Sequence, residues 1–312
     1  MSKLKRALDR AKEIRKSGGG FDPGENISEE PNRLKKALEK RAATSRLESR
    51  GAAEARDVSS DATLEVVDEK PKSQSDVRIS YSKTKVTPVD LKKLKDRKLI
   101  SLFQGSDATE QIKTLRTQIL SKLKEIGGNS LLITSANPGE GKTFTSINLG
   151  ISIAQELERT VLLVDADLRQ PLNGHFDFAK DFFCVDVNSG LSDYLTEKID
   201  IPELLLNPGI QKLTILPGGK YLANSTELLG SARMERLVKE MKNRYKDDRV
   251  IIFDTSSILQ CPDPLELSKF VDGILLVVEE EKTSADQLKR VMELLKDRRV
   301  LGTVLNKSRF SY

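Results

Sequence analysis

The segment that most constrains the fold of this chain is SANPGEGKTFTSINLG, Ser135–Gly150, which directly follows the apolar run Leu131–Thr134. An apolar strand, a glycine-rich turn and a helix-like segment follow one another in the order that builds a loop around a phosphate group. The strict form of this pattern begins with glycine, and this chain has Ala136 there. The other required positions match, so we expect a phosphate loop (residues 136–143) between a strand and a helix.

The phosphate loop predicts which groups would contact a nucleotide. Gly139 and Gly141 let the backbone approach a ligand closely, so that N–H groups and the helix N-terminus can surround it. Lys142 would reach the β- and γ-phosphate oxygens, and the Thr143 hydroxyl would hold Mg²⁺. We expect ATP and Mg²⁺ as cofactors, with these ATP-binding residues in the loop: Pro138, Gly139, Glu140, Gly141, Lys142, Thr143 and Phe144.

Two further apolar runs end in carboxylates. VLLVDADLR, Val161–Arg169, delivers Asp165 and Asp167 into one loop, and residues two apart on an extended chain share a face. One acid could bind or orient Mg²⁺ while the other accepts a proton from an attacking hydroxyl, although a ribose contact or a helix cap would also explain the pair. Asp254 ends another apolar strand and is expected to hold the metal through water. The predicted metal site is therefore Thr143, Asp165 and Asp254.

From about residue 91 onward, apolar runs alternate with amphipathic stretches. Strands are expected at Leu131–Thr134, Val161–Asp165, Leu213–Leu216, Val250–Asp254, Ile274–Val278 and Leu301–Leu305, and helices at Thr143–Glu156, Ala232–Tyr245 and Ala285–Asp297. This rhythm predicts a doubly wound α/β fold, with a mostly parallel sheet covered by helices on both faces. The ligand of such a sheet lies beyond the carboxyl ends of its strands, where the motifs fall. Asn306, after the last strand, could read the edge of a base or simply cap a turn.

The N-terminal part of the chain differs in composition from the rest. Residues 1–100 hold 25 Lys and Arg against 17 Asp and Glu, whereas residues 101–312 hold 27 against 30. With Phe21 and Tyr81 as its only aromatic residues, the N-terminal part cannot bury enough apolar surface to offset its chain entropy. We expect a basic tail over residues 1–90, largely disordered or locally helical, a nucleotide-binding domain over 91–308, and a short tail over 309–312.

The basic tail contains a repeated pattern. KLKRALDR, Lys3–Arg10, returns as RLKKALEK, Arg33–Lys40, and each copy places Leu, Ala and Leu along one side of a basic helix. The copies are either solvated, fraying helices or docking helices for a protein partner or an anionic membrane surface. No apolar run approaches the roughly 18 to 20 residues of a membrane span. The two cysteines, Cys184 and Cys261, match no metal spacing, so a reducing cytoplasm is expected.

Asp-x-Asp-x-Arg on the second strand resembles the Walker A′ motif of bacterial tyrosine autokinases, in particular the cytoplasmic kinases of exopolysaccharide loci, including exosortase-linked ones. The similarity extends over about residues 95–308 and includes GLSDYL (Gly190–Leu195), LTILPGG (Leu213–Gly219), STELLGSARM (Ser225–Met234) and DGILLVVEEEKTS (Asp272–Ser284). The resemblance implies a P-loop NTPase that phosphorylates its own tyrosine. It also implies self-association, with a ring as one form, and a membrane polysaccharide co-polymerase as partner that would hold the kinase at the inner membrane; no nucleic acid partner is expected. The implied catalytic residues are Lys142, Asp165 and Asp167, with Asp167 activating the tyrosine hydroxyl.

Three features depart from this family's pattern. The oligomerisation helix reads Glu-x-x-Arg-x-x-Arg in the family and Glu110-x-x-Lys113-x-x-Arg116 here; lysine lacks the planar fork that pairs two oxygens of a carboxylate, which could weaken the ring. The strand that ends in Asp254 continues into Thr-Ser-Ser instead of Pro-Pro. Only Tyr312 stands where the family has a C-terminal tyrosine cluster, which makes it our candidate for autophosphorylation.

Partitioning and cell-division ATPases share the phosphate loop and form the alternative class. They carry a second lysine five positions before the invariant one, where this chain has Asn137. That difference favours the kinase. The alternative that stays open is a nucleotide-switched assembly ATPase with little kinase activity.

Overall fold

The computed structural model describes residues 85–86, 97–103, 105–169, 178–197, 199–244 and 248–308. The chain divides into two units, Met1–Pro71 and Lys72–Tyr312, and every described residue belongs to the second. The expected tail helices, Lys3–Arg10 and Arg33–Lys40, lie outside the described residues, as does Tyr312.

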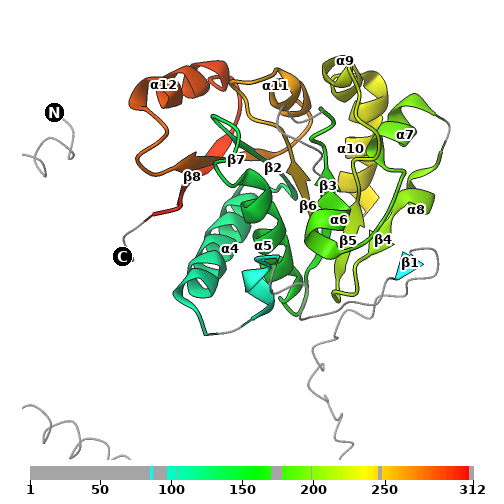
Figure 1. Cartoon of the computed structure of the whole chain (residues 1–312), viewed down its shortest axis with the longest axis horizontal. Helices are drawn as coiled ribbons and strands as arrows, with labels where there is room; N and C mark the ends of the chain where they lie inside the picture. The colour runs from blue at the N-terminus through cyan, green and yellow to red at the C-terminus, as the bar shows by residue number, and fades with distance from the viewer. Residues whose placement is uncertain are drawn as a thin grey trace, which may run out of the picture. The chain divides into compact units, whose positions relative to one another are not determined.

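A mostly parallel sheet forms the centre of the described unit (Figure 1), with the strand order β1-β4-β5-β3-β6-β2-β7-β8. The strands are β1 (Lys85–Val86), β2 (Ser130–Ser135), β3 (Thr160–Asp165), β4 (Leu206–Asn207), β5 (Leu213–Leu216), β6 (Arg249–Asp254), β7 (Gly273–Glu279) and β8 (Val300–Asn306). Neighbouring strands pair in parallel except β4 and β5, which pair antiparallel. The six predicted strands are confirmed to within one residue at each end. The two-residue strands β1 and β4 were not predicted, and β1 lies within the segment expected to be tail.

The helical elements fill the connections between strands. They are η1 (Ile100–Leu102), α4 (Asp107–Glu125), α5 (Lys142–Ala154), α6 (Phe178–Phe183), α7 (Leu191–Thr196), α8 (Ile201–Leu204), α9 (Ser225–Leu229), α10 (Ala232–Arg244), α11 (Asp263–Leu267) and α12 (Ala285–Leu294). The predicted helices correspond to α5, α10 and α12. Helices α5 and α12 end two and three residues before their expected ends, and the expected end of α10, Tyr245, lies outside the described residues. Helix α12 begins where a capping box predicts, because Ser284 Oγ accepts the N–H of Gln287 and the Gln287 side chain accepts the N–H of Ser284.

The sheet separates two apolar clusters, since alternate residues of a strand point to opposite faces. Leu131 and Ile133 of β2 belong to the cluster covered by α4 and α5, which lie side by side in Figure 1. Leu132 belongs to the opposite cluster, with residues of α10 and α12. All six residues of β2 are buried, as expected for a central strand covered on both faces. The carboxylates Asp165 and Asp254 lie at the ends of the central strands β3 and β6.

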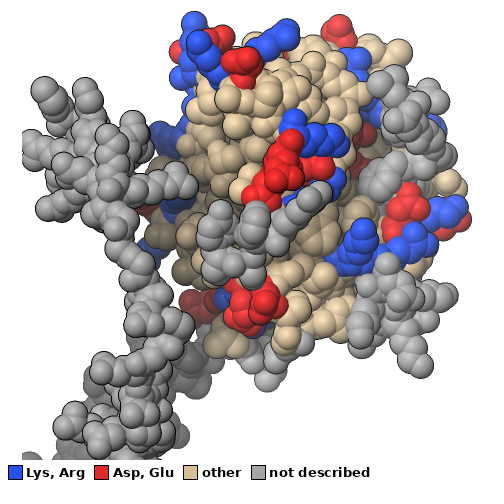
Figure 2. All heavy atoms as spheres, turned by 60° about the vertical axis from the view of Figure 1, so that its left-hand side comes forward, with Lys and Arg blue, Asp and Glu red and all other residues tan. Residues whose placement is uncertain are grey.

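Charged side chains of both signs lie interspersed on the side of the unit seen in Figure 2, with uncharged surface between them. Neither sign forms a continuous patch among the residues coloured there. This pattern agrees with the near balance of 27 basic and 30 acidic residues over 101–312. The basic excess of the chain belongs to its N-terminal part.

Candidate active site

The phosphate loop connects β2 to α5 at the carboxyl end of the sheet. Helix α5 begins at Lys142, and its N-cap, Gly141, has a φ of 97°, in the left-handed region that favours glycine. Gly139 has a φ of 81°, and a Cβ there would meet no atom within 4 Å. An open backbone at a helix N-terminus is an arrangement that binds anions. The predicted ATP-binding residues take three settings here: Pro138 and Gly139 are exposed, Glu140 is buried, and Gly141, Lys142, Thr143 and Phe144 are half-buried.

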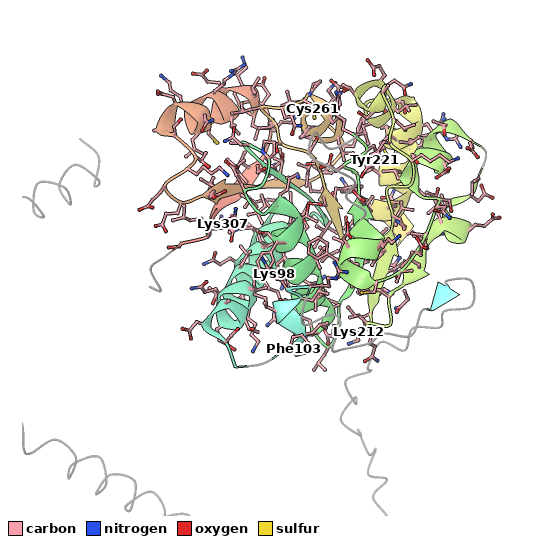
Figure 3. All side chains as sticks on the ribbon, in the orientation of Figure 1. Lys98, Phe103, Lys212, Tyr221, Cys261 and Lys307 are labelled. Atoms are coloured by element: carbon pink, nitrogen blue, oxygen red, sulfur yellow. The ribbon has the colours of Figure 1, made fainter. Side chains whose placement is uncertain are left out.

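The end of β8 holds two carbonyl groups of the phosphate loop. Asn306 Nδ2 donates to the carbonyl of Glu140 at 2.8 Å, and Lys307 Nζ donates to the carbonyl of Gly139 at 2.7 Å. Lys307, labelled in Figure 3, also pairs with Glu279 at the end of β7, at 3.0 Å. A peptide C=O and its N–H point in opposite directions, so these contacts leave loop N–H groups directed away from β8. In this structure the Asn306 amide is engaged with the loop, and its contact with a base stays a prediction.

Three carboxylates surround the ammonium group of Lys142. Its Nζ lies 3.3 Å from Asp167 Oδ2. Burial disfavours the charged lysine, but the charges of Asp167, Asp254 and Asp165 outweigh burial and raise the pKa of Lys142 above its ordinary value. The structure therefore brings together the three residues predicted to be catalytic, Lys142, Asp165 and Asp167.

Asp165 and Asp254 are neighbours because β3 and β6 are adjacent strands. The two residues pair in register, and the N–H of Ala166 donates to the carbonyl of Asp254 at 2.8 Å. Asp165 Oδ1 accepts the N–H of Asp167 at 3.1 Å, which stabilises the bend that carries Asp167 toward the lysine. A Cβ on Gly218 would lie 2.9 Å from Asp165 Oδ2. The absence of a side chain at Gly218, in the loop that follows β5, therefore leaves room for the Asp165 carboxylate.

Asp254 is buried beneath the first turn of α5. It is 1% exposed, and its carboxylate accepts hydrogen bonds from Ser146 Oγ, at 2.8 Å, and from the Thr143 hydroxyl. Burial raises the pKa of Asp254 to about 6, and the charge of Lys142 and the two hydroxyls offset this effect only in part. Ser146 was not predicted as a site residue. Its spacing from Thr143 could have revealed it, because residues three apart on a helix share a face.

The oxygen atoms of Thr143, Asp165 and Asp254 fit a magnesium site. Mg²⁺ prefers oxygen ligands and keeps several waters, and substrate phosphates complete its coordination. The described part of the chain contains no group of three or more Asp, Glu, His or Cys residues that would form a complete protein cage. A hydroxyl beside a buried carboxylate, at the end of a phosphate loop, is the partial set of ligands that such an ion needs.

Comparisons with known proteins agree with this arrangement. A family model described as an AAA domain matches residues 130–304. Tyrosine-protein kinase YwqD of Bacillus subtilis is 33% identical over 205 residues, which cover 65% of this chain and 82% of YwqD. Tyrosine-protein kinase CpsD of Streptococcus agalactiae is 30% identical over 208 residues, covering 66% of this chain and 85% of CpsD. This chain belongs to the bacterial tyrosine-protein kinases.

Solved structures share the fold of this kinase. The chimerical protein CapA2B2 aligns with a TM-score of 0.61 and 28% identity, over 68% of this chain and 90% of that chain. The kinase domain of Escherichia coli tyrosine kinase ETK aligns with a TM-score of 0.57 and 29% identity, over 65% and 78% of the two chains. The predicted family and the predicted P-loop NTPase fold are confirmed.

The residues predicted for oligomerisation of the kinase lie on α4 with different exposures. Lys113 pairs with Glu110 at 2.8 Å, and their side chains are 33% and 65% exposed. Arg116 is 17% exposed and pairs with Glu156 at 2.8 Å, and it also donates to the carbonyl of Ser152 at 3.1 Å. Arg116 therefore ties α4 to the end of α5. Glu110 and Lys113 are the more accessible pair for a neighbouring subunit.

A chain of polar contacts that the sequence did not reveal connects the phosphate loop of the kinase to α12. Asn137 Nδ2 donates to Glu140 Oε1 at 2.9 Å, and the Thr283 hydroxyl donates to the same oxygen. Gln287, in the first turn of α12, donates to Asn137 Oδ1 at 3.1 Å. The position at which partitioning ATPases carry their second lysine is thus occupied here by an amide that binds within the subunit.

Lowering the pH from 7 to 4 should stabilise the nucleotide-free kinase through Asp254 and weaken its binding of Mg-nucleotide. The pKa of about 6 in the folded protein exceeds the ordinary value of 3.8, so the folded state binds the proton first. The resulting stability is fully present below about pH 4 and is lost as the pH rises through about 6, a change of about 3 kcal/mol. Thermal unfolding across this range, with and without Mg-ADP, measures both effects. Asp254→Asn should remove this contribution from the nucleotide-free profile; the same pH dependence in both proteins would contradict the assignment.

Proposed function

We propose that this chain is an ATP-dependent protein-tyrosine autokinase that regulates the biosynthesis or export of an exopolysaccharide. The observation that carries the proposal is the convergence of Lys142, Asp165, Asp167 and Asp254 at the phosphate loop of a chain in the tyrosine-kinase family. The resemblance of residues 95–308 to kinases of exopolysaccharide loci supports the process.

In this proposal the described residues divide the work of phosphoryl transfer. The loop N–H groups and Lys142 bind the phosphates. Thr143, Asp165 and Asp254 would hold Mg²⁺, which would neutralise charge on the phosphate oxygens. A tyrosine hydroxyl has a pKa near 10, so it must lose its proton as it attacks the γ-phosphorus, and Asp167 accepts that proton. The bond from the γ-phosphorus to the bridging oxygen breaks, and ADP leaves.

The ion pair between Lys142 and Asp167 suggests how ATP prepares this base. Lys142 Nζ and Asp167 Oδ2 lie 3.3 Å apart. A γ-phosphate that reaches Lys142 competes with Asp167 for the ammonium group, because both are anions. ATP binding would thereby release the Asp167 carboxylate toward an incoming tyrosine.

Incubation of the purified protein with Mg-ATP should produce phosphotyrosine, chiefly on Tyr312. The segment that contains Tyr312 has no predicted strand or helix, which favours an approach in line with the γ-phosphate of a neighbouring subunit. In contrast, Tyr194 lies on α7 beneath the guanidinium group of Arg233, 4.5 Å from the ring centroid. Mass spectrometry locates the phosphate, with Tyr312→Phe as the control. Phosphate on Tyr221 or Tyr81 alone would move the acceptor, and phosphate release without phosphotyrosine would favour the assembly ATPase.

The proposal includes a membrane polysaccharide co-polymerase as partner and a position beside the inner membrane. Among the described helices, none has the length and apolar character to span a membrane. The basic tail, with its repeated pattern, is our candidate for contact with the partner or adjacent lipid. Deleting residues 1–50 should lower recovery with membranes that contain such a partner and leave ATP binding unchanged. A deletion that abolishes ATP binding would contradict a docking role for the tail.

A further inference from the structure

The carboxylate of Glu140 is enclosed within the phosphate loop. Glu140 is 0% exposed. One oxygen, Oε1, accepts hydrogen bonds from Asn137 and Thr283. The other oxygen, Oε2, is buried and makes no hydrogen bond within the described part of the chain. A buried carboxylate ordinarily has its oxygens hydrogen-bonded and its charge paired, so this one requires an explanation.

Two lysines at the phosphate loop, Lys142 within it and Lys307 bound to its Gly139 carbonyl, pair with other acids. Lys142 Nζ lies 3.3 Å from Asp167, and Lys307 Nζ lies 3.0 Å from Glu279. Both partners of Glu140, an amide and a hydroxyl, are neutral groups. The charge of Glu140 therefore has no cation to balance it among the residues described here.

A negative charge on Glu140 would act on the nucleotide phosphates that the phosphate loop is proposed to bind. The residue lies between Gly139 and Gly141, whose backbone surrounds the phosphates in the proposed function. Because the side chain is buried, solvent ions screen its charge much less than they screen an exposed carboxylate. When a nucleotide occupies the loop, an ionised Glu140 would therefore repel its phosphates, against the attraction of Lys142 and the loop N–H groups.

We propose that Glu140 sets the nucleotide affinity of this kinase, keeping the binding of ADP weak enough for rapid release after transfer. This inference rests on the proposed function, because it assumes that the phosphate loop holds ATP and ADP. In many enzymes product release limits turnover, and tight binding of substrate and product alike does not accelerate the chemical step. Glu140 is thus a residue that tunes affinity from within the loop rather than a residue that touches the reacting atoms.

Glu140→Gln is the direct test, because the amide keeps the shape of the side chain and an oxygen for Asn137 and Thr283. We expect the variant to bind Mg-ADP roughly tenfold more tightly than the wild type, as the loss of one poorly screened like charge predicts. Steady-state turnover should fall by a similar factor because ADP leaves slowly, while phosphotyrosine formation in a single turnover keeps its rate. Titration calorimetry with Mg-ADP, together with steady-state and single-turnover assays, measures these quantities.

Three further variants separate charge from structure. Thr283→Val removes a hydrogen bond to Glu140 and keeps the charge, so it should leave ADP affinity unchanged or weaken it. Glu293→Gln removes an exposed carboxylate on α12 and should have no effect. Glu140→Met removes the charge with a side chain of similar volume and should also tighten binding, which keeps the test available if Glu140→Gln does not fold.

The outcomes distinguish this inference from the proposed function. Unchanged or weaker ADP binding by folded Glu140→Gln would overturn the inference, and so would equal tightening by Thr283→Val, which would assign the effect to the hydrogen bonds. A wild-type protein that binds no Mg-ADP would overturn the proposed function and this inference together. A wild type that binds Mg-ADP and forms no phosphotyrosine would overturn only the kinase activity, and the affinity measurement would still decide the role of Glu140.

Discussion

Lys142→Ala is expected to abolish phosphotyrosine formation and to weaken ATP binding by roughly a hundredfold, the loss expected for a buried, charge-assisted contact to phosphate. The structure gives a second reason for a large effect. Lys142 is the cation that faces Asp167, Asp254 and Asp165, and all three raise its pKa. Without the ammonium group, the negative charges of these carboxylates would repel the triphosphate with no lysine charge to balance them. Titration with a non-hydrolysable Mg-ATP analogue and an immunoblot for phosphotyrosine measure the two losses.

Two variants control for this lysine substitution. Lys220→Ala removes an exposed lysine of the β5 loop that pairs with Asp193 at 3.2 Å, and it should leave nucleotide binding unchanged. Lys142→Arg keeps the charge but changes the geometry of its donors, so it should restore part of the binding and little of the transfer. Ordinary autophosphorylation by Lys142→Ala would remove this residue from the mechanism.

The central strands could be predicted because burial on both faces demands continuous aliphatic runs. Every residue of β2 and β5 is buried, and most of their residues are aliphatic: β2 contains Leu-Leu-Ile and β5 reads Leu-Thr-Ile-Leu. The strands β1 and β4 have only two residues each, too few to show a period, and β4 pairs antiparallel to β5. Such short strands form because tertiary contacts place them beside a partner, a cause that a local pattern does not contain.

The residues of the candidate site likewise divide into those that a local sequence pattern predicts and those that depend on tertiary contacts. Asp165 and Asp254 could be predicted, since each ends an apolar run and a parallel sheet brings such ends together. The contacts of Glu140 could not, because the motif allows any residue at that position and its partner Thr283 lies 143 residues away. The labelled residues of Figure 3 mark the two ends of the sheet. Cys261 and Tyr221 lie at the end where the parallel strands finish, and Lys212 lies at the opposite end.

Arg116 makes contacts within the subunit, and its predicted role in oligomerisation stays a prediction. It pairs with Glu156, and it donates to the carbonyl of Ser152 near the end of α5. A substitution at Arg116 would therefore loosen α4 within the subunit as well as affect assembly. Glu110, 65% exposed, is the better probe of a subunit interface because it makes its ion pair on α4 itself.

Asp167→Asn is expected to separate binding from chemistry. The asparagine carries no charge, so it releases Lys142 from its ion pair and removes one anion from beside the phosphates. Mg-ATP should bind at least as tightly as in the wild type. Phosphotyrosine formation should fall by about 10²- to 10⁴-fold, the range for a general base, because an amide cannot accept the tyrosine proton.

Asp165→Asn provides the matched control, since Asp165 lies two residues earlier and pairs in register with Asp254. Because Asp165 is assigned to the metal, Asp165→Asn should need a higher Mg²⁺ concentration for phosphotyrosine formation. Raising the Mg²⁺ concentration should restore its rate. The defect of Asp167→Asn should persist at every Mg²⁺ concentration, since no metal replaces a proton acceptor. Single-turnover assays across a Mg²⁺ series compare the two variants. Rescue of Asp167→Asn by Mg²⁺ would assign Asp167 to the metal, and a wild-type rate in that variant would exclude it as the base.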